Sequence, residues 1–469
     1  MNLIKLKNLL LLLLIFALAL YLRVFNLNFD DYWFDEQVTF FISNPNVNID
    51  ETLKRIGEYN NSSDYIFSII LKYFFSIFSY SPEIGRLLPV LFSILSIPAI
   101  AILAYQIKKN NGYLIVFFLT SVNFYLISYA QELRVYSFLY FISILSIIFF
   151  YILISEKTFL KKLIFSVIYI IISIVGIFSH TFFFIIIFSQ LFYTILNNIY
   201  YNKKNYIIYF SFSSIAIFFL FFGYKFLLAQ LSIQQYWLPS IKIDFFYNYF
   251  FSRYFGSKIM GVIYLFTLIY LIIHLKKNIF IISEKIFLLI IILIFSYLLP
   301  IIYGLINIPI LIDRYIIFVL IPIFLLISLL IIDIPNKNVR LSLAILIFFS
   351  SLLNNYIEIF ERKNSKPEFR KTLEYIKNSN TKNVAIVSSE KWETSITNYV
   401  ESRNDFKNYK LKIISLKKIN KNIKSIWIIC YEAVLINSRC SMPDYEYKNW
   451  KEEKTSKYKF ISIKLMNRV

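Results

Sequence analysis

The sequence predicts a polytopic α-helical membrane protein with a small extracytoplasmic α/β domain at its C-terminal end. Of its 469 residues, 58% are hydrophobic and 16% are charged, whereas a soluble domain carries about 25% charged residues. Apolar runs recur from the N-terminus to about residue 357, each close to the ~20 residues that span a bilayer. Loops rich in Lys and Arg alternate with loops that carry acidic residues, which is typical of a multi-spanning chain.

The apolar runs predict about eleven transmembrane helices. The first run follows Lys5 and Lys7 and resembles a signal peptide, but it lacks a clear small-residue cleavage site, so we expect an uncleaved span. Residues 163–198 are long enough for two short spans, broken between Gly176 and His180. The predicted spans are 8–25, 84–107, 112–129, 135–154, the two within 163–198, 206–228, 259–275, 285–305, 314–332 and 340–357.

The charges in the loops predict the orientation of the chain. Lys and Arg gather in every second loop, and the positive-inside rule places these loops in the cytoplasm together with the N-terminus. The opposite side then receives the acidic loops, the 229–258 loop and the whole C-terminal segment. The cytoplasmic cations are Lys5, Lys7, Lys108, Lys109, Lys157, Lys161, Lys162, Lys203, Lys204, Lys276, Lys277, Lys337 and Arg340.

Charge and cysteine content argue against two classes of site. The formal net charge is +21, but many cations lie in short topogenic loops and the others are scattered, so we expect no nucleic-acid partner. The two cysteines, Cys430 and Cys440, cannot form a four-cysteine metal site. They are either bridged in the oxidising outer compartment or both reduced.

Two regions outside the predicted spans have structure of their own. In the first outer loop, residues 26–83, the run Tyr65–Tyr80 is apolar but short and contains Lys72, so we expect an interfacial helix. Residues 358–469 lose the apolar runs and predict an α/β domain, which leaves residues 1–357 as the transmembrane domain. The expected elements are a helix at Pro367–Asn378, buried strands at Val384–Ser388 and Ser425–Cys430, and an edge strand at Lys459–Leu465.

Asp35 and Glu36 are the first residues with a candidate chemical role. They lie a few residues past the first span, at the outer membrane face. An adjacent carboxylate pair can supply a general base together with a metal ligand or a hydrogen-bonding partner, and partial desolvation makes a carboxylate more basic. The alternative is a solvated pair of loop acids.

Glu132 and Arg134 flank Leu133 at the outer junction of the third and fourth spans. Ionisable groups at membrane depth are costly and are often functional. The two residues either pair with each other or face the same pocket as Asp35, where the planar guanidinium group would suit a phosphate.

Three further outer segments carry side chains of this kind. His180 lies in an outer hairpin, where a lone histidine is more often packed than a ligand. Arg314 opens the tenth span, either to contact an anionic head group or to snorkel as an interfacial anchor. Trp237, beside Tyr236, is either an interface anchor or an aromatic platform for a sugar or lipid.

Position unites these five segments, because all of them are expected on the outer side near the membrane surface. Transporters place ionisable residues near the midplane, in helices broken by Gly or Pro, and we find no such pattern in this sequence. The arrangement indicates an enzyme that takes a phosphate-bearing lipid from the bilayer and an acceptor from the aqueous side.

In these motifs the chain resembles the bacterial GT-C polytopic glycosyltransferases, and among them the superfamily of protein O-mannosyltransferases and the lipid A aminoarabinose transferase (glycosyltransferase family 39-like). The likeness runs through most of residues 8–465. One departure is Asn61–Tyr65, where many relatives have Pro-Pro or His-Pro before the interfacial helix. The matching motifs are Trp33–Gln37, Tyr80–Ser93 with Arg86 as its arginine, Ala130–Tyr136, Ser179–Phe183, Tyr236–Pro239, Asp313–Ile316 and Pro367–Arg370.

The resemblance implies an inverting glycosyltransferase of the bacterial plasma membrane. Its donor would be a polyprenyl-phosphate sugar, and its acceptor a lipid, a glycan or a protein on the outer side. The family's catalytic base carries over onto Asp35, with Glu36 assisting and Glu132 as the second acidic motif. The residues expected to bind or neutralise the donor phosphate are Arg134, His180 and Arg314, and those expected to line the substrate site are Trp33, Tyr136, Trp237 and Tyr315.

Metal use and three other functions stay open at this point. Some members of the superfamily require a divalent metal, which Asp35, Glu36 and Glu132 could hold. A flippase for a lipid-linked sugar would need polar residues along the midplane, of which the sequence has few. A polymerase or ligase for lipid-linked glycans would depend on arginines and a histidine without needing Asp35, and a structural membrane protein would explain none of the motif clustering.

Overall fold

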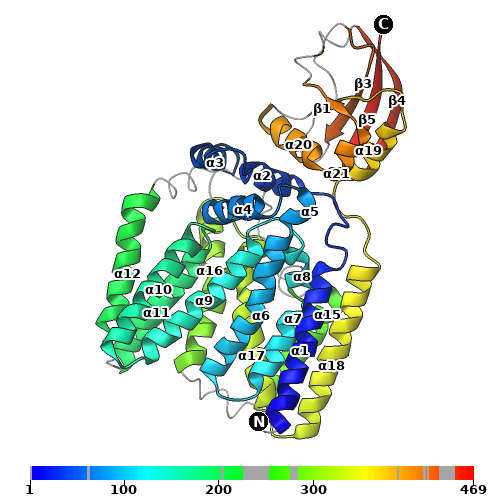
Figure 1. Ribbon diagram of the computed structural model, residues 1–469. Helices are drawn as coiled ribbons and strands as arrows, with labels where there is room; N and C mark the ends of the chain where they lie inside the picture. The colour runs from blue at the N-terminus through cyan, green and yellow to red at the C-terminus, as the bar shows by residue number, and fades with distance from the viewer. Residues whose placement is uncertain are drawn as a thin grey trace.

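The computed structural model describes residues 3–60, 64–201, 205–224, 253–274, 284–387, 390–415, 419, 422–431 and 449–469. Within these ranges eight helices are long and apolar enough to cross a membrane, and the bent pair α7–α8 makes a ninth span. Two shorter apolar helices, α1 and α15, belong to the same bundle (Figure 1). Every predicted span therefore has its helix, and the predicted fold class is confirmed.

The helices of the bundle follow the predicted spans closely. Most are apolar on all sides, as expected of helices that face either lipid or one another. In chain order they are α1 (Leu3–Val24), α6 (Leu87–Ile107), α7 (Gly112–Val122) with α8 (Phe124–Ala130), α9 (Tyr136–Ser155), α10 (Phe159–Ile177), α11 (Phe183–Tyr201), α12 (Tyr206–Phe218) with η2 (Phe219–Gly223), α15 (Lys258–His274), α16 (Glu284–Ile306), η4 (Asp313–Val319) with α17 (Leu320–Ile332), and α18 (Lys337–Asn355) with η5 (Tyr356–Phe360).

The break between α7 and α8 carries the chain to a polar loop at one end of the bundle. The two helices meet at 54°, and the side chain of Asn123 caps the second. Arg23 of α1 is fully buried and donates hydrogen bonds to the carbonyl groups of Thr120 and Ser121, at 3.0 and 2.8 Å. A break inside a membrane helix is stable when the freed backbone groups find such partners. α8 then leads directly into the loop that holds Glu132.

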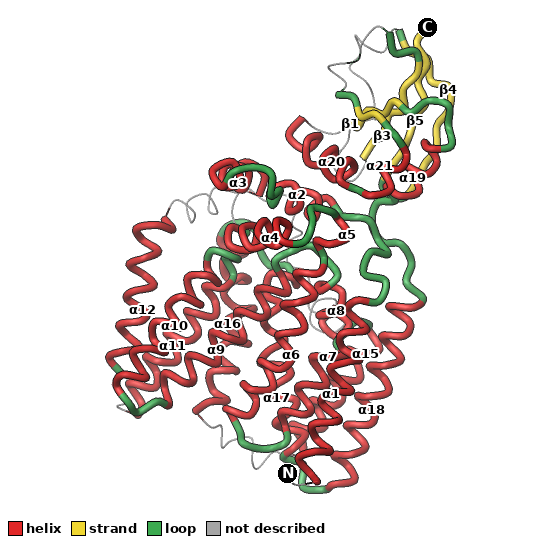
Figure 2. Tube along the Cα trace, in the orientation of Figure 1, coloured by secondary structure: helices red, strands yellow, loops and turns green. Residues whose placement is uncertain are grey.

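Short helices lie across this end of the bundle and connect α1 to α6 (Figure 2). They are α2 (Phe34–Ile42), α3 (Ile49–Arg55) with η1 (Ile56–Asn60), α4 (Tyr65–Ile77) and α5 (Pro82–Gly85). α4 corresponds to the expected interfacial helix, with Phe67, Leu71 and Phe75 buried and Ile77 exposed. Its location at a membrane surface stays a prediction.

The C-terminal segment folds into a five-stranded mixed sheet of order β2-β1-β3-β5-β4. β1 pairs in parallel with β2 and β3, whereas β5 runs antiparallel to β3 and β4. The strands are β1 (Asn383–Val387), β2 (Lys412–Ile413), β3 (Ser425–Tyr431), β4 (Trp450–Tyr458) and β5 (Ile461–Arg468), and the helices are α19 (Phe369–Lys377), α20 (Glu390–Ser402) and α21 (Asn404–Tyr409).

One strand prediction is wrong in detail. The segment predicted as an edge strand forms β5, which has a neighbour on each side. The edge beyond β5 is β4, whose Lys and Glu side chains are exposed, as is common where a sheet edge must not pair further. Cys430 in β3 is disulfide-bonded, and Cys440 lies outside the described residues.

The C-terminal domain sits on the first outer loop, at the end of the molecule opposite the N-terminus (Figure 1). The rings of Tyr32 and Tyr399 stack at 5.0 Å, and those of Phe34 and Trp392 meet edge to face at 4.9 Å. α2, which carries the Asp-Glu motif, is therefore held between the bundle and this domain. That this end is the extracytoplasmic one stays a prediction.

Candidate active site

A cavity of about 310 Å³ opens where the first outer loop, the end of the bundle and the linker between η5 and α19 (residues 361–368) meet. A volume of this size lies within the usual range for small-molecule sites. Its wall contains three carboxylates and three cations, and we call it the outer cavity. The lining residues are Trp33, Asp35, Glu36, Glu132, Arg134, Arg314, Ser365 and Lys366.

Asp35 is the accessible acid of the α2 motif. It lies in the first turn of the helix, where the helix dipole favours a carboxylate. Its side chain is 34% exposed, and Oδ2 lies 3.5 Å from the guanidinium group of Arg314. The carboxylate thus faces the outer cavity, and among the described residues its one ion pair is the long contact with Arg314. Asp35 is therefore able to approach a substrate hydroxyl.

Glu36, the neighbour of Asp35, has the opposite surroundings. It is 1% exposed, and its two oxygens accept hydrogen bonds from Arg86 at 3.0 and 3.2 Å, from Lys366 at 2.7 Å and from the backbone N–H of Leu133 at 2.9 Å. Burial alone would raise the pKa of Glu36, but the charges of Arg86 and Lys366 outweigh it and lower the pKa to about 2. With both oxygens occupied, Glu36 can assist Asp35 by fixing the position of α2.

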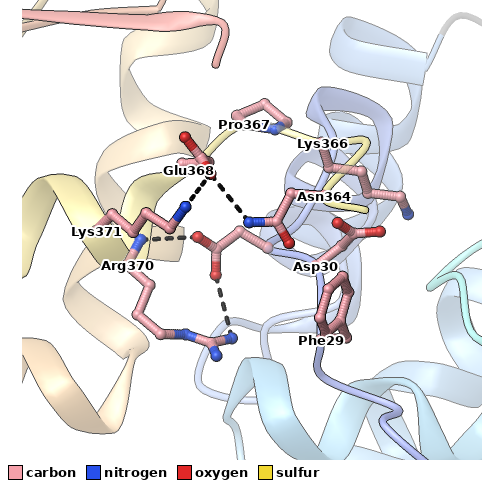
Figure 3. Close-up of a pocket in the computed structure, with 9 residues that line it drawn as sticks. Phe29, Asp30, Asn364, Lys366, Pro367, Glu368, Arg370 and Lys371 are labelled. Atoms are coloured by element: carbon pink, nitrogen blue, oxygen red, sulfur yellow. Dashed lines mark hydrogen bonds and ion pairs between the residues drawn. The ribbon is translucent and has the colours of Figure 1, made fainter. Parts of the chain in front are cut away.

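Two further ion pairs join the first outer loop to the C-terminal segment. Asp30 pairs with Arg362 at 2.5 Å, and Asp31 pairs with Arg403 at 2.6 Å. Together with Glu36–Lys366, we call these three ion pairs the latch. Beside the latch lies a small pocket of about 80 Å³ (Figure 3). Asp31, which also lines this pocket, accepts hydrogen bonds from the backbone N–H and the guanidinium group of Arg370, at 2.7 and 3.5 Å.

Two arginines border the outer cavity next to Asp35. Arg134 donates hydrogen bonds to Thr39 Oγ1 at 2.7 Å and to the carbonyl group of Asp35 at 3.2 Å, and it pairs with Asp64 at 3.4 Å. Burial would lower the pKa of Arg134, but the charge of Asp64 outweighs it and raises the pKa, so the side chain stays charged. The Nε–H groups of Arg134 and Arg314 are buried and have no partner among the described residues, so neither guanidinium group has all of its donors paired.

Solved structures share the fold of this chain, although no similar sequence is found. No family model and no curated protein matches the sequence. The crystal structure of ArnT from Cupriavidus metallidurans in the apo state covers 98% of this chain and 97% of its own, with a TM-score of 0.60 at 9% identity. The same protein bound to undecaprenyl phosphate gives the same coverage and TM-score at 8% identity. An Archaeoglobus fulgidus oligosaccharyltransferase in complex with Zn and sulfate covers 89% of this chain and 67% of its own, with a TM-score of 0.50 at 11% identity.

The chain has the GT-C fold. The match to ArnT includes both the helical bundle and the C-terminal domain, since it covers nearly the whole of both chains. The latch is therefore a contact between two parts of one shared architecture. At these identities the match establishes the fold, and the chemistry has to be argued from the residues of the outer cavity.

The GT-C fold brings most of the predicted site residues together. Asp35, Glu132, Arg134, Arg314 and Trp33 all line the outer cavity. Tyr136 lies below both arginines, with their guanidinium carbons 5.9 and 5.7 Å from its ring centre. Tyr315 is beside Arg314 at 5.8 Å, and Trp237 lies outside the described residues.

His180 lies behind the cavity wall. It is buried, and its ring is 5.1 Å from that of Tyr315 and 6.2 Å from that of Tyr136. Burial, with the charges of Arg134 and Arg314, lowers the pKa of His180 to about 3. A neutral imidazole brings no positive charge to a phosphate, so the surroundings of His180 do not favour the predicted role in neutralising the donor.

The described residues do not fit a divalent metal. They contain no group of three or more His, Cys, Asp or Glu side chains that could hold one. Asp35 and Glu132, the expected ligands, each face a cation instead: Arg314 at 3.5 Å and Lys366 at 3.0 Å. We therefore derive no step that uses a metal.

Lys366 and Ser365 are the residues of the outer cavity that the sequence does not indicate, and Lys366 is the charged one. It is buried and bridges Glu36 and Glu132, at 2.7 and 3.0 Å. Its position in a linker far along the chain gave no signal beyond the motif that starts at Pro367. Asp64, the partner of Arg134, lies in the Asn61–Tyr65 segment that departs from the family pattern, and the sequence around it carries no other signal.

Proposed function

We propose that the chain is an inverting membrane glycosyltransferase. It transfers a sugar from a polyprenyl-phosphate donor to a hydroxyl group of an acceptor, on the extracytoplasmic side of the bacterial plasma membrane. The observation that carries the proposal is the outer cavity, where an accessible carboxylate and two incompletely paired arginines lie together at the end of the transmembrane bundle. The undecaprenyl phosphate bound to ArnT, which has the same fold, supports a lipid phosphate as part of the donor.

In this mechanism Asp35 acts as the general base. It takes the proton of the acceptor hydroxyl, whose oxygen attacks the anomeric carbon from the face opposite the phosphate. The new glycosidic C–O bond forms as the bond between the sugar and the phosphate oxygen breaks, and the polyprenyl phosphate leaves as an anion. Arg134 and Arg314 stabilise the charge that develops on the leaving phosphate.

Glu36 and Glu132 act through position. Glu36, Arg86 and Lys366 fix α2, and so the direction of the Asp35 side chain. Glu132 holds Lys366 from the other side of the cavity. The C-terminal domain, residues 358–469, is therefore part of the working enzyme, because its linker supplies Lys366.

The test is a donor panel with one decisive variant. The purified protein is incubated with a series of polyprenyl-phosphate sugars, and release of the lipid phosphate is measured. We expect release with at least one donor, and a loss of about 10²–10⁴-fold for Asp35→Asn with unchanged membrane insertion and thermal stability. Normal activity of Asp35→Asn would refute the mechanism, and transbilayer movement of the donor without bond cleavage would indicate a flippase.

A further inference from the structure

Phe460 lies at the tip of the β4–β5 hairpin in a conformation that its side chain disfavours. The strands pair as far as Tyr458 and Ile461, so Lys459 and Phe460 alone form the turn. The φ angle of Phe460 is +55°, in the left-handed region where Gly, Asn and Asp are favoured. The turn itself therefore gives no reason for an aromatic residue at this position.

The core of the domain gives no reason for it either. Phe460 is 37% exposed. Among the described residues from 361 to 469, it is the most exposed aromatic side chain. A strained residue that the core of the domain does not need points to a role at the domain surface.

The ring of Phe460 contacts the wall of the outer cavity through Trp33. It meets the ring of Trp33 edge to face, with 5.3 Å between the centroids and 87° between the planes. Trp33 is part of the cavity wall together with Asp35. In Figure 1 the C-terminus, just after β5, marks the end of the domain far from the bundle, so the hairpin tip lies at the near end.

The hairpin tip is fixed to the linker that carries Lys366. The backbone N–H of Lys459 donates to Glu368 Oε2 at 3.2 Å, and its Nζ donates to the carbonyl group of Asn364 at 2.6 Å. Glu368 returns a backbone hydrogen bond to the carbonyl group of Lys459 at 3.3 Å, and its carboxylate also binds Asn364 and Lys371 (Figure 3). Phe460 is thus held at a defined distance from the cavity.

We infer that Phe460 and Trp33 form the acceptor subsite and that it binds a pyranose ring. The inference rests on the proposed function and names the acceptor side of that same site. A sugar offers an apolar face of C–H groups to an aromatic ring and a rim of hydroxyls to polar neighbours. Here the polar neighbours are Lys459 on the hairpin and Ser365 and Lys366 in the linker.

Other acceptors fit this rim less well. A fatty chain would need a continuous apolar surface, whereas the groups around the aromatic pair are charged or hydroxylic. A peptide that extends the sheet would pair with the open edge of β4 instead of its turn. The pyranose belongs either to a free oligosaccharide or to the head group of a glycolipid, and both present the same chemistry to Phe460.

The experiment measures sugar binding without turnover. The Asp35→Asn chain is reconstituted in nanodiscs free of sugar detergents, and saturation-transfer NMR is recorded with maltotriose, with chitotriose and with a short-chain alkyl glycoside as the lipid-borne form. We expect at least one of them to bind through its ring protons. Phe460→Gly should weaken that binding by about tenfold, the loss of one aromatic contact, while the thermal midpoint stays the same or rises because glycine accepts the turn.

Lys410→Gly is the matched control. Lys410 has a φ of +52° in the same domain and is no part of the cavity wall, so the substitution relieves similar backbone strain and should leave sugar binding unchanged. Binding of the alkyl glycoside alone supports the inference and assigns the source to a lipid.

Three results overturn the inference: no sugar signal at millimolar concentration, equal binding by Phe460→Gly, or binding of a Ser/Thr-containing peptide in place of every sugar. The two proposals fail separately. Asp35-dependent donor cleavage without sugar binding refutes only the subsite, whereas sugar binding without Asp35-dependent cleavage refutes only the catalytic mechanism.

Discussion

The latch and the outer cavity are both built from acid–cation pairs, and they differ in how completely those pairs are formed. In the latch, Asp30, Asp31 and Glu36 are buried and meet their cations at 2.5 to 2.7 Å. In the cavity, Asp35 is one-third exposed and lies 3.5 Å from Arg314. Complete pairing stabilises a structure, whereas an incompletely satisfied donor or acceptor is available for a ligand.

The difference is sharpest between two consecutive residues. Asp35 and Glu36 share one turn of α2 and both belong to the cavity wall. Asp35 is one-third exposed, whereas Glu36 is buried and joins α2 to the bundle and the linker. A helix sends neighbouring side chains about 100° apart, so adjacent acids point in different directions. An Asp-Glu motif at a helix start can thus supply one reactive group and one anchor.

Weakening the pairing of Glu36, the latch residue that contacts the bundle, should have the largest effect on stability. Arg86→Met removes both hydrogen bonds to Glu36 and leaves that buried carboxylate with Lys366 as its remaining cation. We expect a loss of about 3–5 kcal/mol in the free energy of unfolding, which should appear as a lower midpoint of thermal unfolding in nanodiscs.

A double-variant cycle tests the cause of this loss. Arg86→Met combined with Glu36→Gln no longer leaves a buried charge short of a partner, so it should recover part of the stability. An additive loss in the double variant would show that the pair is not the reason.

Removing a cation from the outer cavity should lower turnover and leave the fold unchanged. Arg314→Met removes a cation whose recorded ion pair, with Asp35, is long, so its loss should barely change thermal stability. We expect kcat/KM for the donor to fall by about 10²–10³-fold, as for other groups that stabilise developing charge. Arg314→Lys keeps the charge without the planar guanidinium group and should recover part of the rate.

The parts of this arrangement that the sequence predicts are those with a local signal. Hydropathy locates the spans, and the alternation of charged loops collects Asp35, Glu132, Arg134 and Arg314 at one end of the bundle, where the structure finds them around one cavity. Each of these residues lies in a loop or at a helix end next to a span. The topology alone therefore brings them close.

The parts that escape prediction depend on distant partners. Nothing near Glu36 distinguishes it from Asp35, because Arg86 and Lys366, which bury and pair it, come from remote segments. β4 was missed because its run of Lys and Glu residues lacks an apolar face, although such charge is common in an edge strand. The regular alternation of polar and apolar residues in β5 is typical of an edge strand, so it predicts the edge at a strand that has two neighbours.

The smallest predicted effect is a change of stability with pH, which occurs in different pH ranges for the outer cavity and for the latch. His180 stays neutral in the folded protein because its pKa is lowered to about 3, whereas in the unfolded chain it takes up a proton near its ordinary pKa of 6.5. The unfolded state then binds more protons as the pH falls, so the folded state loses stability, by about 2 kcal/mol between about pH 7 and pH 5.

His180→Asn should remove this pH-dependent loss in thermal-denaturation curves. Glu36 cannot account for a change in that range: its pKa is lowered from 4.5 to about 2, so its contribution is full above about pH 4.5 and is lost only as the pH falls towards 2. A decline of thermal stability above pH 5 therefore reports on His180 beside the outer cavity. A decline below pH 4.5 that Glu36→Gln abolishes reports on the latch. If His180→Asn leaves the upper decline unchanged, burial beside Arg134 and Arg314 is not what keeps the imidazole neutral.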